Sequence, residues 1–317
     1  MKHMKFLSFF LGIAFAIIAC SSNNETIPAP EVDPDGDDGT TEVEFAKGAD
    51  IGWVTEYESK GYNFYNAKGE QRECTALMKE LGLDAIRIRV WVDPSKHGNW
   101  CNTADVVEKA KRAKELGMDV MIDFHYSDWW ADPAQQNKPA SWVGKNLVNL
   151  KSAIKDHTVS VLQALKEIGV IPKWVQVGNE IRPGMLWDED VALSGASYNV
   201  TEKDLKDALA SATDKVVYPM NWANLGAFVT TGYDAVKSVF PDAIVIVHLD
   251  NGWDSGLFTW FFDELKKNGG KWDMIGMSLY PYWSRDAKEG YSSADAVITD
   301  CISNIKALST KYNCDVM

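Results

Sequence analysis

Residues 114–124 have the sequence KELGMDVMIDF, and two other stretches share its pattern: KELGLDAIRIRV at residues 79–90 and KEIGVIPKWVQV at residues 166–177. Each begins with Lys-Glu, an apolar residue and a glycine. This is typical of a helix end, because glycine readily adopts the left-handed conformation just past the last turn. The apolar run after each glycine predicts a strand buried on both faces, as in parallel sheets. The chain is therefore predicted to consist of repeated helix and strand units.

Further apolar runs predict more strands of the same kind. Together they give six strands and the start of a seventh, at residues 47–51, 83–90, 118–124, 170–177, 243–248, 274–280 and 314–317. No GxGxxG follows an early strand, so a doubly wound nucleotide-binding sheet lacks its usual marker. A (β/α)8 barrel typically takes about 250 residues. We therefore expect an α/β fold over residues 47–317, a (β/α)8 TIM barrel that is C-terminally truncated in this chain.

The start of the chain is typical of an export signal. Lys2 and Lys5 precede an apolar run at residues 6–19, which is shorter than the roughly 20 residues that a membrane-spanning helix needs. The run ends at Cys20 and resembles a bacterial lipoprotein signal, in which that cysteine carries the lipid; a cleaved signal with a chance cysteine is the alternative. We expect residues 1–20 to be a lipoprotein-type signal with Cys20 as the lipidation site. The protein is then an extracytoplasmic, membrane-anchored lipoprotein of the bacterial periplasm or cell surface.

Acidic residues exceed basic ones, 45 Asp and Glu against 32 Lys and Arg, and the net charge is −13. Such a surface repels phosphate backbones, so nucleic acid is not expected as a partner. Eight acids and no base lie between Glu25 and Glu44, among prolines and glycines. A segment of this composition buries too little apolar surface to fold. Residues 21–46 are therefore expected to form a disordered acidic tether.

Four cysteines follow Cys20, namely Cys74, Cys101, Cys301 and Cys314. Export permits disulfides, and the spacing leaves both disulfide pairing and buried free thiols open. No two of them form a CxxC pair, so a zinc site is not expected.

Polar and aromatic residues follow the predicted strands, which is where a barrel carries its site. Arg87, Arg89 and Trp91 share one face of the second strand. The two arginines either pair with neighbouring helices or point into the barrel and hold carboxylates there. Glu180 ends the fourth strand after Asn179; it either caps a following helix or acts as a general acid in partly apolar surroundings. The ends of the third, fifth and sixth strands add the candidates His125, Asp128, Trp130, His248, Asp250, Trp253 and Tyr280.

Aromatic rings combined with carboxylates and amides are typical of a carbohydrate cleft, where sugar faces stack on tryptophan and hydroxyls bind polar groups. No phosphate cradle, HExxH spacing or GxSxG elbow indicates another chemistry.

Several ordered blocks of the chain resemble glycoside hydrolase family 53, the endo-β-1,4-galactanases. These blocks are residues 48–50, 87–94, 123–133, 177–182 and 248–253. The resemblance implies a retaining endo-β-1,4-galactanase that cuts galactan and type I arabinogalactan, including pectin side chains, and that requires no cofactor. It also implies site roles. Glu180 matches the acid/base, Asn179 would hydrogen-bond the sugar 2-hydroxyl, and Arg87 or Arg89 would steady the nucleophile. The subsite at the broken bond would be lined by His125, His248 and Tyr280, substrate would bind Asp128 and Asp250, and sugar platforms would be Trp91, Trp130 and Trp253.

The nucleophile of this family is a Glu at the end of the seventh strand, and no residue of this chain matches it. We expect it beyond residue 317, so the 317-residue chain is expected to be inactive. The eighth strand, and a calcium site that some relatives carry in their late loops, would also lie beyond residue 317.

Two other functions remain open. Another barrel endo-glycosidase, acting on mannan or xylan, is possible because an Asn-Glu pair at the end of the fourth strand is shared across related families; the blocks at residues 123–133 and 248–253 argue against it. A non-catalytic surface glycan-binding lipoprotein is consistent with the tether, the aromatic residues and the unmatched nucleophile.

Overall fold

The structure, a computed structural model, describes residues 45–187, 221–282, 284 and 293–317. The predicted signal, Cys20 and nearly all of the predicted tether lie outside the described residues. In the described part, no helix is long and apolar enough to cross a membrane.

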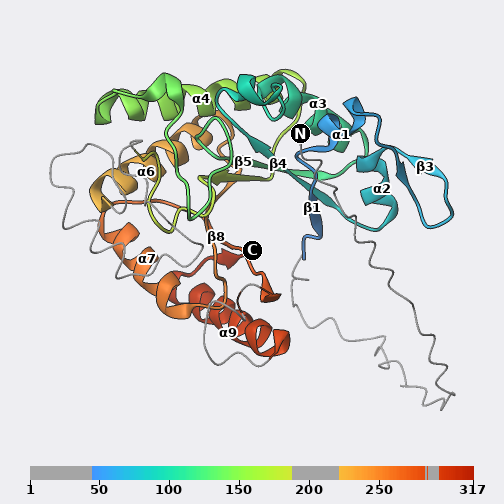
Figure 1. The fold of residues 1–317 in the computed structure, drawn as a ribbon. Coiled ribbons are helices and arrows are strands. Elements are labelled where there is room, and N and C mark those ends of the chain that lie inside the picture. The colour runs from blue at the N-terminus through green and yellow to red at the C-terminus, as the bar shows by residue number, and fades with distance from the viewer. Residues whose placement is uncertain (1–44, 188–220, 283, 285–292) are drawn as a thin grey trace, which may run out of the picture. The chain divides into compact units, whose positions relative to one another are not determined.

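In the described residues, seven parallel strands form one sheet, and their order in space follows their order along the chain (Figure 1). Its order is β1 (Gly48–Asp50), β4 (Ala85–Val90), β5 (Asp119–Phe124), β6 (Trp174–Val177), β7 (Ile244–Leu249), β8 (Met274–Met277) and β9 (Asp315–Val316). This is the strand order of a (β/α)8 barrel, in which each right-handed crossover places the next strand beside the last. The sequence-based prediction of six strands and the start of a seventh is confirmed.

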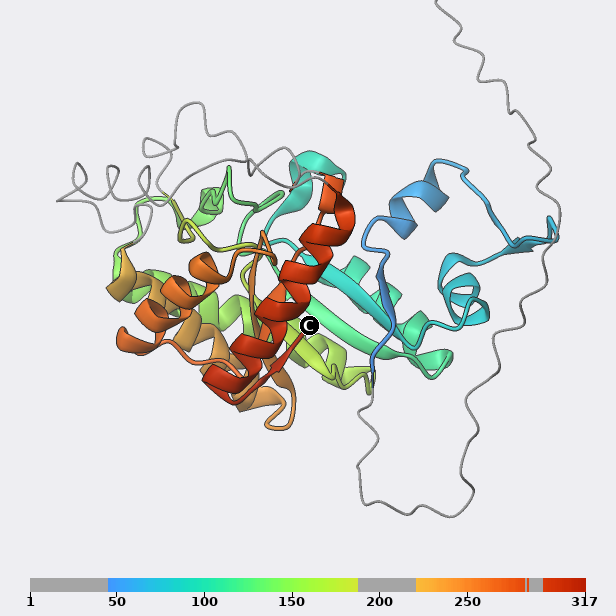
Figure 2. The same cartoon turned by 90° about the horizontal axis from the view of Figure 1, so that it is seen from below.

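Helices connect the strands and follow one another around one face of the curled sheet (Figure 1). They are α1 (Val54–Ser59), α2 (Cys74–Glu80), α3 (Thr103–Glu115), α4 (Leu147–Glu167), α6 (Trp222–Val239), α7 (Ser255–Lys267) and α9 (Ala294–Tyr312), with short 3-10 turns at Pro94–His97 and Ala140–Trp142. Figure 2 shows α9 beside α7. The glycines just beyond the C-caps of α2, α3 and α4 have positive φ angles, as the repeated pattern predicts; they are Gly82, Gly117 and Gly169.

The two faces of the sheet have different cores. Ile88, Ile122 and Val175 belong to the large apolar cluster that includes helix residues such as Phe258 and Leu162. The other face, the inner one, carries a small separate apolar cluster of Ala85, Met121, Trp174, Ile246 and Met274. Because side chains alternate along a strand, the positions two residues onward share this inner face. Those positions are polar or glycine: Arg87, Asp123, Gln176, His248 and Gly276.

Two details differ from the prediction. A short antiparallel hairpin, β2 (Phe64–Tyr65) with β3 (Gln71–Arg72), lies between α1 and α2. Two-residue strands are too short to produce a detectable alternation, so the sequence did not indicate them. The strand predicted at residues 274–280 ends at Met277, and residues 281 and 282 are helical. All four cysteines in the described residues are free thiols, so of the two possibilities the structure has unpaired cysteines.

Candidate active site

Arg87 connects the carboxyl ends of three strands on the inner face. Its guanidinium lies 2.6 Å from Asp50 Oδ2 at the end of β1 and 2.7 Å from Asp123 Oδ2 on β5. It also donates to Asn179 Oδ1 at 3.0 Å and to Gln176 Oε1 at 3.1 Å. These partners lie on strands or, for Asn179, just after one. Of the two possibilities left open by the sequence, Arg87 therefore points inward and not toward the helices.

Asp123 is the buried counter-charge of this network. Its side chain is 0% exposed, and it accepts from Arg87, from Gln176 Nε2 at 2.5 Å and from His125 Nε2 at 2.9 Å. Burial opposes ionisation of this carboxyl, but the charges of Arg87 and His125 and the hydrogen bond from His125 outweigh it and lower its pKa. Asp123 therefore anchors Arg87 as a fixed cation. Sequence reasoning placed Asp123 in a strand but missed this role.

Asn179 has a fixed amide orientation. Its Nδ2 donates to the carbonyl oxygen of Ala131 at 2.7 Å, so Oδ1 is the atom that faces Arg87 and Gln176. His248 Nδ1 also lies 3.0 Å from Asn179 Oδ1. The predicted site residues Arg87, Asn179 and His248 are therefore brought together.

Glu180 directly follows Asn179 and has a left-handed backbone with φ of 50°. A non-glycine residue pays for this conformation only where its surroundings enforce it, and here the peptide is tied to its neighbours: the N–H of Ile181 donates to His248 O at 3.2 Å and Gln136 Nε2 donates to Asn179 O at 2.8 Å. The backbone thus orients the Glu180 carboxyl toward β8.

The Glu180 carboxyl is partly buried and contacts one side chain closely, with Ser278 Oγ 2.6 Å from its Oε1. Burial raises its pKa to about 7, and the negative charges of Asp250 and Asp132 act in the same direction. The hydrogen bond from Ser278 and the positive charge of Arg87 oppose this shift. A carboxyl of this pKa is poised to give and take a proton near neutral pH.

His248 lies near the carboxyl end of β7, on the inner face, between Asn179 and Ser278. Its Nε2 is 2.9 Å from Ser278 Oγ. Burial, and then the positive charge of Arg87, lower its pKa to about 3. The imidazole is therefore neutral at ordinary pH and carries a single ring proton.

His125 has both ring nitrogens committed within the protein. Nε2 contacts Asp123, and Nδ1 accepts from the backbone N–H of Ala131 at 2.9 Å. His125 therefore orients Asp123 and holds the loop that presents Ala131 to Asn179.

Asp128 joins two loops. Its Oδ1 accepts from the N–H of Asp93 at 3.0 Å and its Oδ2 from the N–H of Ala140 at 2.9 Å. Asp250 is held by a two-pronged contact with Arg182, at 2.8 and 2.9 Å. Both carboxylates are thus used inside the protein, and sequence reasoning did not single out Arg182.

The candidate sugar platforms differ in exposure. Trp130 is 39% exposed, and the Arg89 guanidinium lies 4.3 Å from its ring centre. Trp91 is 2% exposed and packs on Trp129 and Trp130, while Trp253 is also buried. Tyr280 is 60% exposed, and its pKa is raised, first by burial of the hydroxyl and then by the charge of Glu180. Trp130 and Tyr280 are therefore the predicted site rings with open surface.

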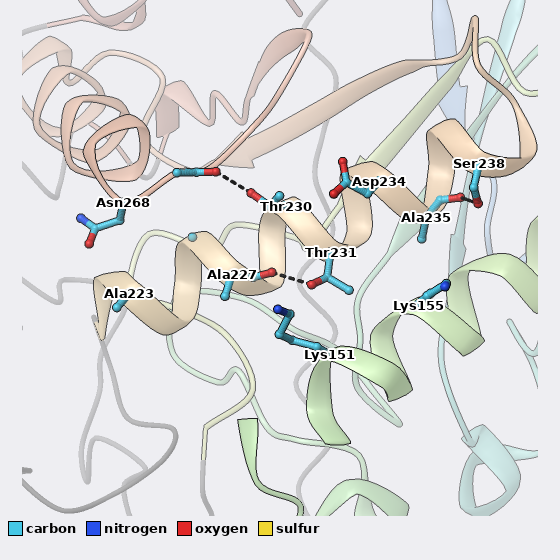
Figure 3. Close-up of a pocket in the computed structure, with 12 residues that line it drawn as sticks. Lys151, Lys155, Ala223, Ala227, Thr230, Thr231, Asp234, Ala235, Ser238 and Asn268 are labelled. Atoms are coloured by element: carbon cyan, nitrogen blue, oxygen red, sulfur yellow. Dashed lines mark hydrogen bonds between the residues drawn. The ribbon is translucent and has the colours of Figure 1, made fainter. Parts of the chain in front are cut away.

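Within the described residues, no group of three or more His, Cys, Asp or Glu side chains is arranged to hold a metal ion. A groove of about 460 Å³ lies between α4 and α6, away from the candidate active site (Figure 3). Its threonine hydroxyls bond to backbone carbonyls, Thr230 to Gly269 and Thr231 to Ala227, as the dashed lines in Figure 3 show.

Residues 46–317 match the family model described as Glycosyl hydrolase family 53. An uncharacterised protein of Niallia circulans is 38% identical over 242 residues, covering 76% of this chain and 60% of that protein. An arabinogalactan endo-β-1,4-galactanase of Thermothelomyces thermophilus is 33% identical over 247 residues, covering 76% of this chain and 65% of the enzyme. A solved structure of a fungal β-1,4-galactanase has a TM-score of 0.69 at 30% identity, covering 86% of this chain and 72% of that one. The chain spans less than two thirds of the length of the two curated relatives.

Proposed function

The chain belongs to glycosyl hydrolase family 53, and on that premise we propose that the protein is a retaining endo-β-1,4-galactanase with Glu180 as its acid/base. Its substrate is β-1,4-galactan, including the galactan of type I arabinogalactan and of pectin side chains. The galactanases among its relatives support this substrate, as does the open Trp130 face beside the polar network.

The observation that carries the proposal is the environment of Glu180. Burial raises the pKa of this carboxyl to about 7, whereas the neighbouring Asp123 is held ionised by Arg87. Carboxyls whose surroundings push their pKa values apart are typical of acid/base machinery. Glu180 can therefore be protonated when a glycosidic bond is presented to it and ionised once that proton has left.

The proposed reaction has two steps at Glu180. In the first, the carboxyl proton of Glu180 moves to the glycosidic oxygen as the bond to the sugar breaks. In the second, the Glu180 carboxylate takes a proton from the attacking water and is restored. Asn179 uses one amide hydrogen on Ala131, and its second amide hydrogen is the donor for the sugar 2-hydroxyl.

Retention also requires a nucleophilic carboxylate roughly 5 to 5.5 Å from the acid/base. The family resemblance assigns this role to a Glu at the end of the seventh strand, and no described residue matches it. Hydrolysis is therefore to be measured with the full product of the gene.

The direct test compares galactan hydrolysis by the full gene product with that by its Glu180→Gln variant, measured as new reducing ends. The amide cannot give up a proton, so the rate is expected to fall by about 100-fold to 10,000-fold, the usual contribution of general acid/base catalysis. The exposed Glu167, at the end of α4, supplies a matched control, because Glu167→Gln makes the same chemical change away from the site. Full activity of Glu180→Gln would contradict the proposal.

A polysaccharide panel tests the substrate. The family match does not favour a mannan- or xylan-specific enzyme or a non-catalytic glycan binder. We expect cleavage of galactan with neither mannan nor xylan cut at a comparable rate. Binding of galactan without any hydrolysis by the full gene product would support the binder instead.

We further propose that the protein is exported and anchored to a bacterial membrane through a lipid on Cys20, with residues 21–46 as the tether. The lysines, apolar run and cysteine at the start of the sequence support this proposal. Any calcium ion would bind in late loops of the barrel, as the family resemblance implies.

A further inference from the structure

We propose that Ser278 is a positioning residue whose hydroxyl switches its hydrogen bond between His248 and Glu180 as Glu180 loses and regains its proton. The inference rests on the proposed function of Glu180 as the acid/base and adds a residue that sequence reasoning did not single out.

Ser278 is held by its backbone directly after β8. Its N–H donates to Leu249 O at 2.8 Å, and its carbonyl accepts from the N–H of Gly252 at 2.8 Å. The main chain is therefore anchored to the end of β7 on both sides, and the remaining freedom is rotation of the hydroxyl. That hydroxyl lies 2.6 Å from Glu180 Oε1 and 2.9 Å from His248 Nε2.

The tautomer of His248 follows from its neighbours. Asn179 Oδ1 can only accept, because Nδ2 of the same amide is the atom that donates to Ala131. His248 Nδ1 lies 3.0 Å from this acceptor, and the backbone N–H of Glu180 also points at Nδ1 from 3.4 Å. We assign the ring proton to Nδ1 because the shorter of these two contacts would otherwise join two acceptors. The ring is neutral, so Nε2 has no proton and accepts from the Ser278 hydroxyl.

The Ser278 hydroxyl has one proton and two neighbours that can accept it. When Glu180 is protonated, its carboxyl proton is donated to Ser278 Oγ, and Ser278 donates to His248 Nε2. When Glu180 is ionised, Ser278 turns and donates to the carboxylate instead. Ser278 keeps its own proton throughout. When substrate binds, the Glu180 hydroxyl turns from Ser278 Oγ to the glycosidic oxygen, and its proton is transferred there.

Several charged or titratable groups face Glu180 besides this pair. Asp250 and Asp132 favour its neutral form, Arg87 favours its ionised form, and Tyr280 lies near enough to be affected by its charge. Ser278 is the partner that can serve both forms, because it accepts from the acid and donates to the base. The switch thus keeps the carboxyl in one orientation through both steps.

The activity test measures the pH dependence of kcat/KM in the full gene product. Rate requires protonated Glu180, so it falls as pH rises through the pKa of that group. Ser278→Ala removes the donor that stabilises the carboxylate, and the alkaline limb is expected to move upward by about half to one pH unit, with kcat lowered about 10-fold. Ser278→Thr keeps the hydroxyl and is expected to restore the limb. Ser303→Ala, at an exposed serine of α9, is the matched control.

A second measurement does not depend on turnover. ¹⁵N NMR of histidine-labelled protein, with the His248 signals assigned by His248→Gln, reports which ring nitrogen is protonated. We expect protonated Nδ1, and an Nε2 shift that follows the titration of Glu180 and is pH-independent in Glu180→Gln. A proton on Nε2, or an Nε2 signal insensitive to Glu180, would overturn the switch.

The outcomes separate the two proposals. If Glu180→Gln retains full hydrolysis, the proposed function fails. If Glu180→Gln is inactive but Ser278→Ala leaves the alkaline limb unchanged, the function stands and the switch is refuted.

Discussion

At Glu180, burial of the side chain conflicts directly with ionisation of its carboxyl. Its pKa is raised from 4.5 to about 7, first by burial and then by the charges of Asp250 and Asp132. A carboxyl that is harder to ionise in the folded protein than in the unfolded chain binds more protons when folded over the pH range between these values. The stability contributed by the neutral form is therefore complete below pH 4.5 and is lost as pH rises through 7.

This conflict predicts a pH-dependent stability difference between the protein and Glu180→Gln. The amide does not titrate, so the free energy of unfolding of the variant is expected to rise relative to that of the parent by about 1–3 kcal/mol between pH 4.5 and pH 8. The size of this change is set by the shift in the pKa of Glu180. Urea unfolding at several pH values measures it. Glu167→Gln is expected to show no such trend, and a pH-independent difference for Glu180→Gln would contradict the assigned burial of the carboxyl.

At the residue scale, the sequence indicates which polar residues lie at the strand ends better than which partners they contact. The two-residue alternation correctly predicts that Arg87 and Arg89 share one face of their strand, because alternation depends on the strand alone, but it left open whether that face is the inner one. The roles of Asp123 and Ser278 could not be predicted in this way, because their partners come from other strands. The stagger between strands cannot be read from the sequence of any single strand. The sequence also predicts substrate contact for His125, but its two nitrogens bond within the protein.

Among the elements, α6 is packed so closely that two of its glycines have no room for a side chain. A methyl group on Gly226 would lie 2.3 Å from the carbonyl oxygen of Asn268, and one on Gly232 would lie 2.5 Å from Val177 Cγ1. The first neighbour is backbone and cannot rotate away. Gly226 therefore sets the distance between α6 and the end of α7.

This packing predicts that Gly226→Ala lowers the free energy of unfolding by about 1–3 kcal/mol, as overpacking usually does. The matched control is Gly256→Ala in α7, where the nearest atom to the added methyl is Asp254 Oδ1 at 3.4 Å. There the higher helix propensity of alanine is expected to leave stability unchanged or raise it by up to about 1 kcal/mol. Equal effects of the two substitutions, measured by urea unfolding, would show that α6 can shift.

The elements themselves were the most predictable part of the fold. A glycine after each Lys-Glu pair ends a helix by a local backbone requirement, so α2, α3 and α4 end where the pattern predicts. The hairpin of β2 and β3 was missed because its pairing depends on contacts between strands of only two residues each.

For the whole molecule, the order of the seven strands follows from connectivity, since short right-handed crossovers leave few other arrangements. Along the strands, the inner face changes from apolar to polar. Its apolar cluster lies toward the amino-terminal ends, where Ala85 and Trp174 begin their strands, and its polar network lies toward the carboxyl ends. On the inner face, the buried carboxylate of Asp123 is thus paired with Arg87.

The proposed anchor is also tested on the whole protein. Cys20→Ala removes the thiol to which the lipid would be attached, so the protein is expected to move from the membrane fraction to the soluble fraction of the cells that produce it. Cys314→Ala, at a free thiol of the barrel, is the control and should remain with the membrane. An unchanged distribution of Cys20→Ala would argue for attachment by another route.

Asp128 has a consequence for anyone who redesigns this protein. Its two carboxylate oxygens accept from the backbone N–H groups of Asp93 and Ala140, so this one side chain connects the loop after β4 to the loop after β5. Exchanging either loop alone for that of a relative would break this connection between the two loops. The two segments therefore form a single interchangeable cassette, to be transplanted together or left alone.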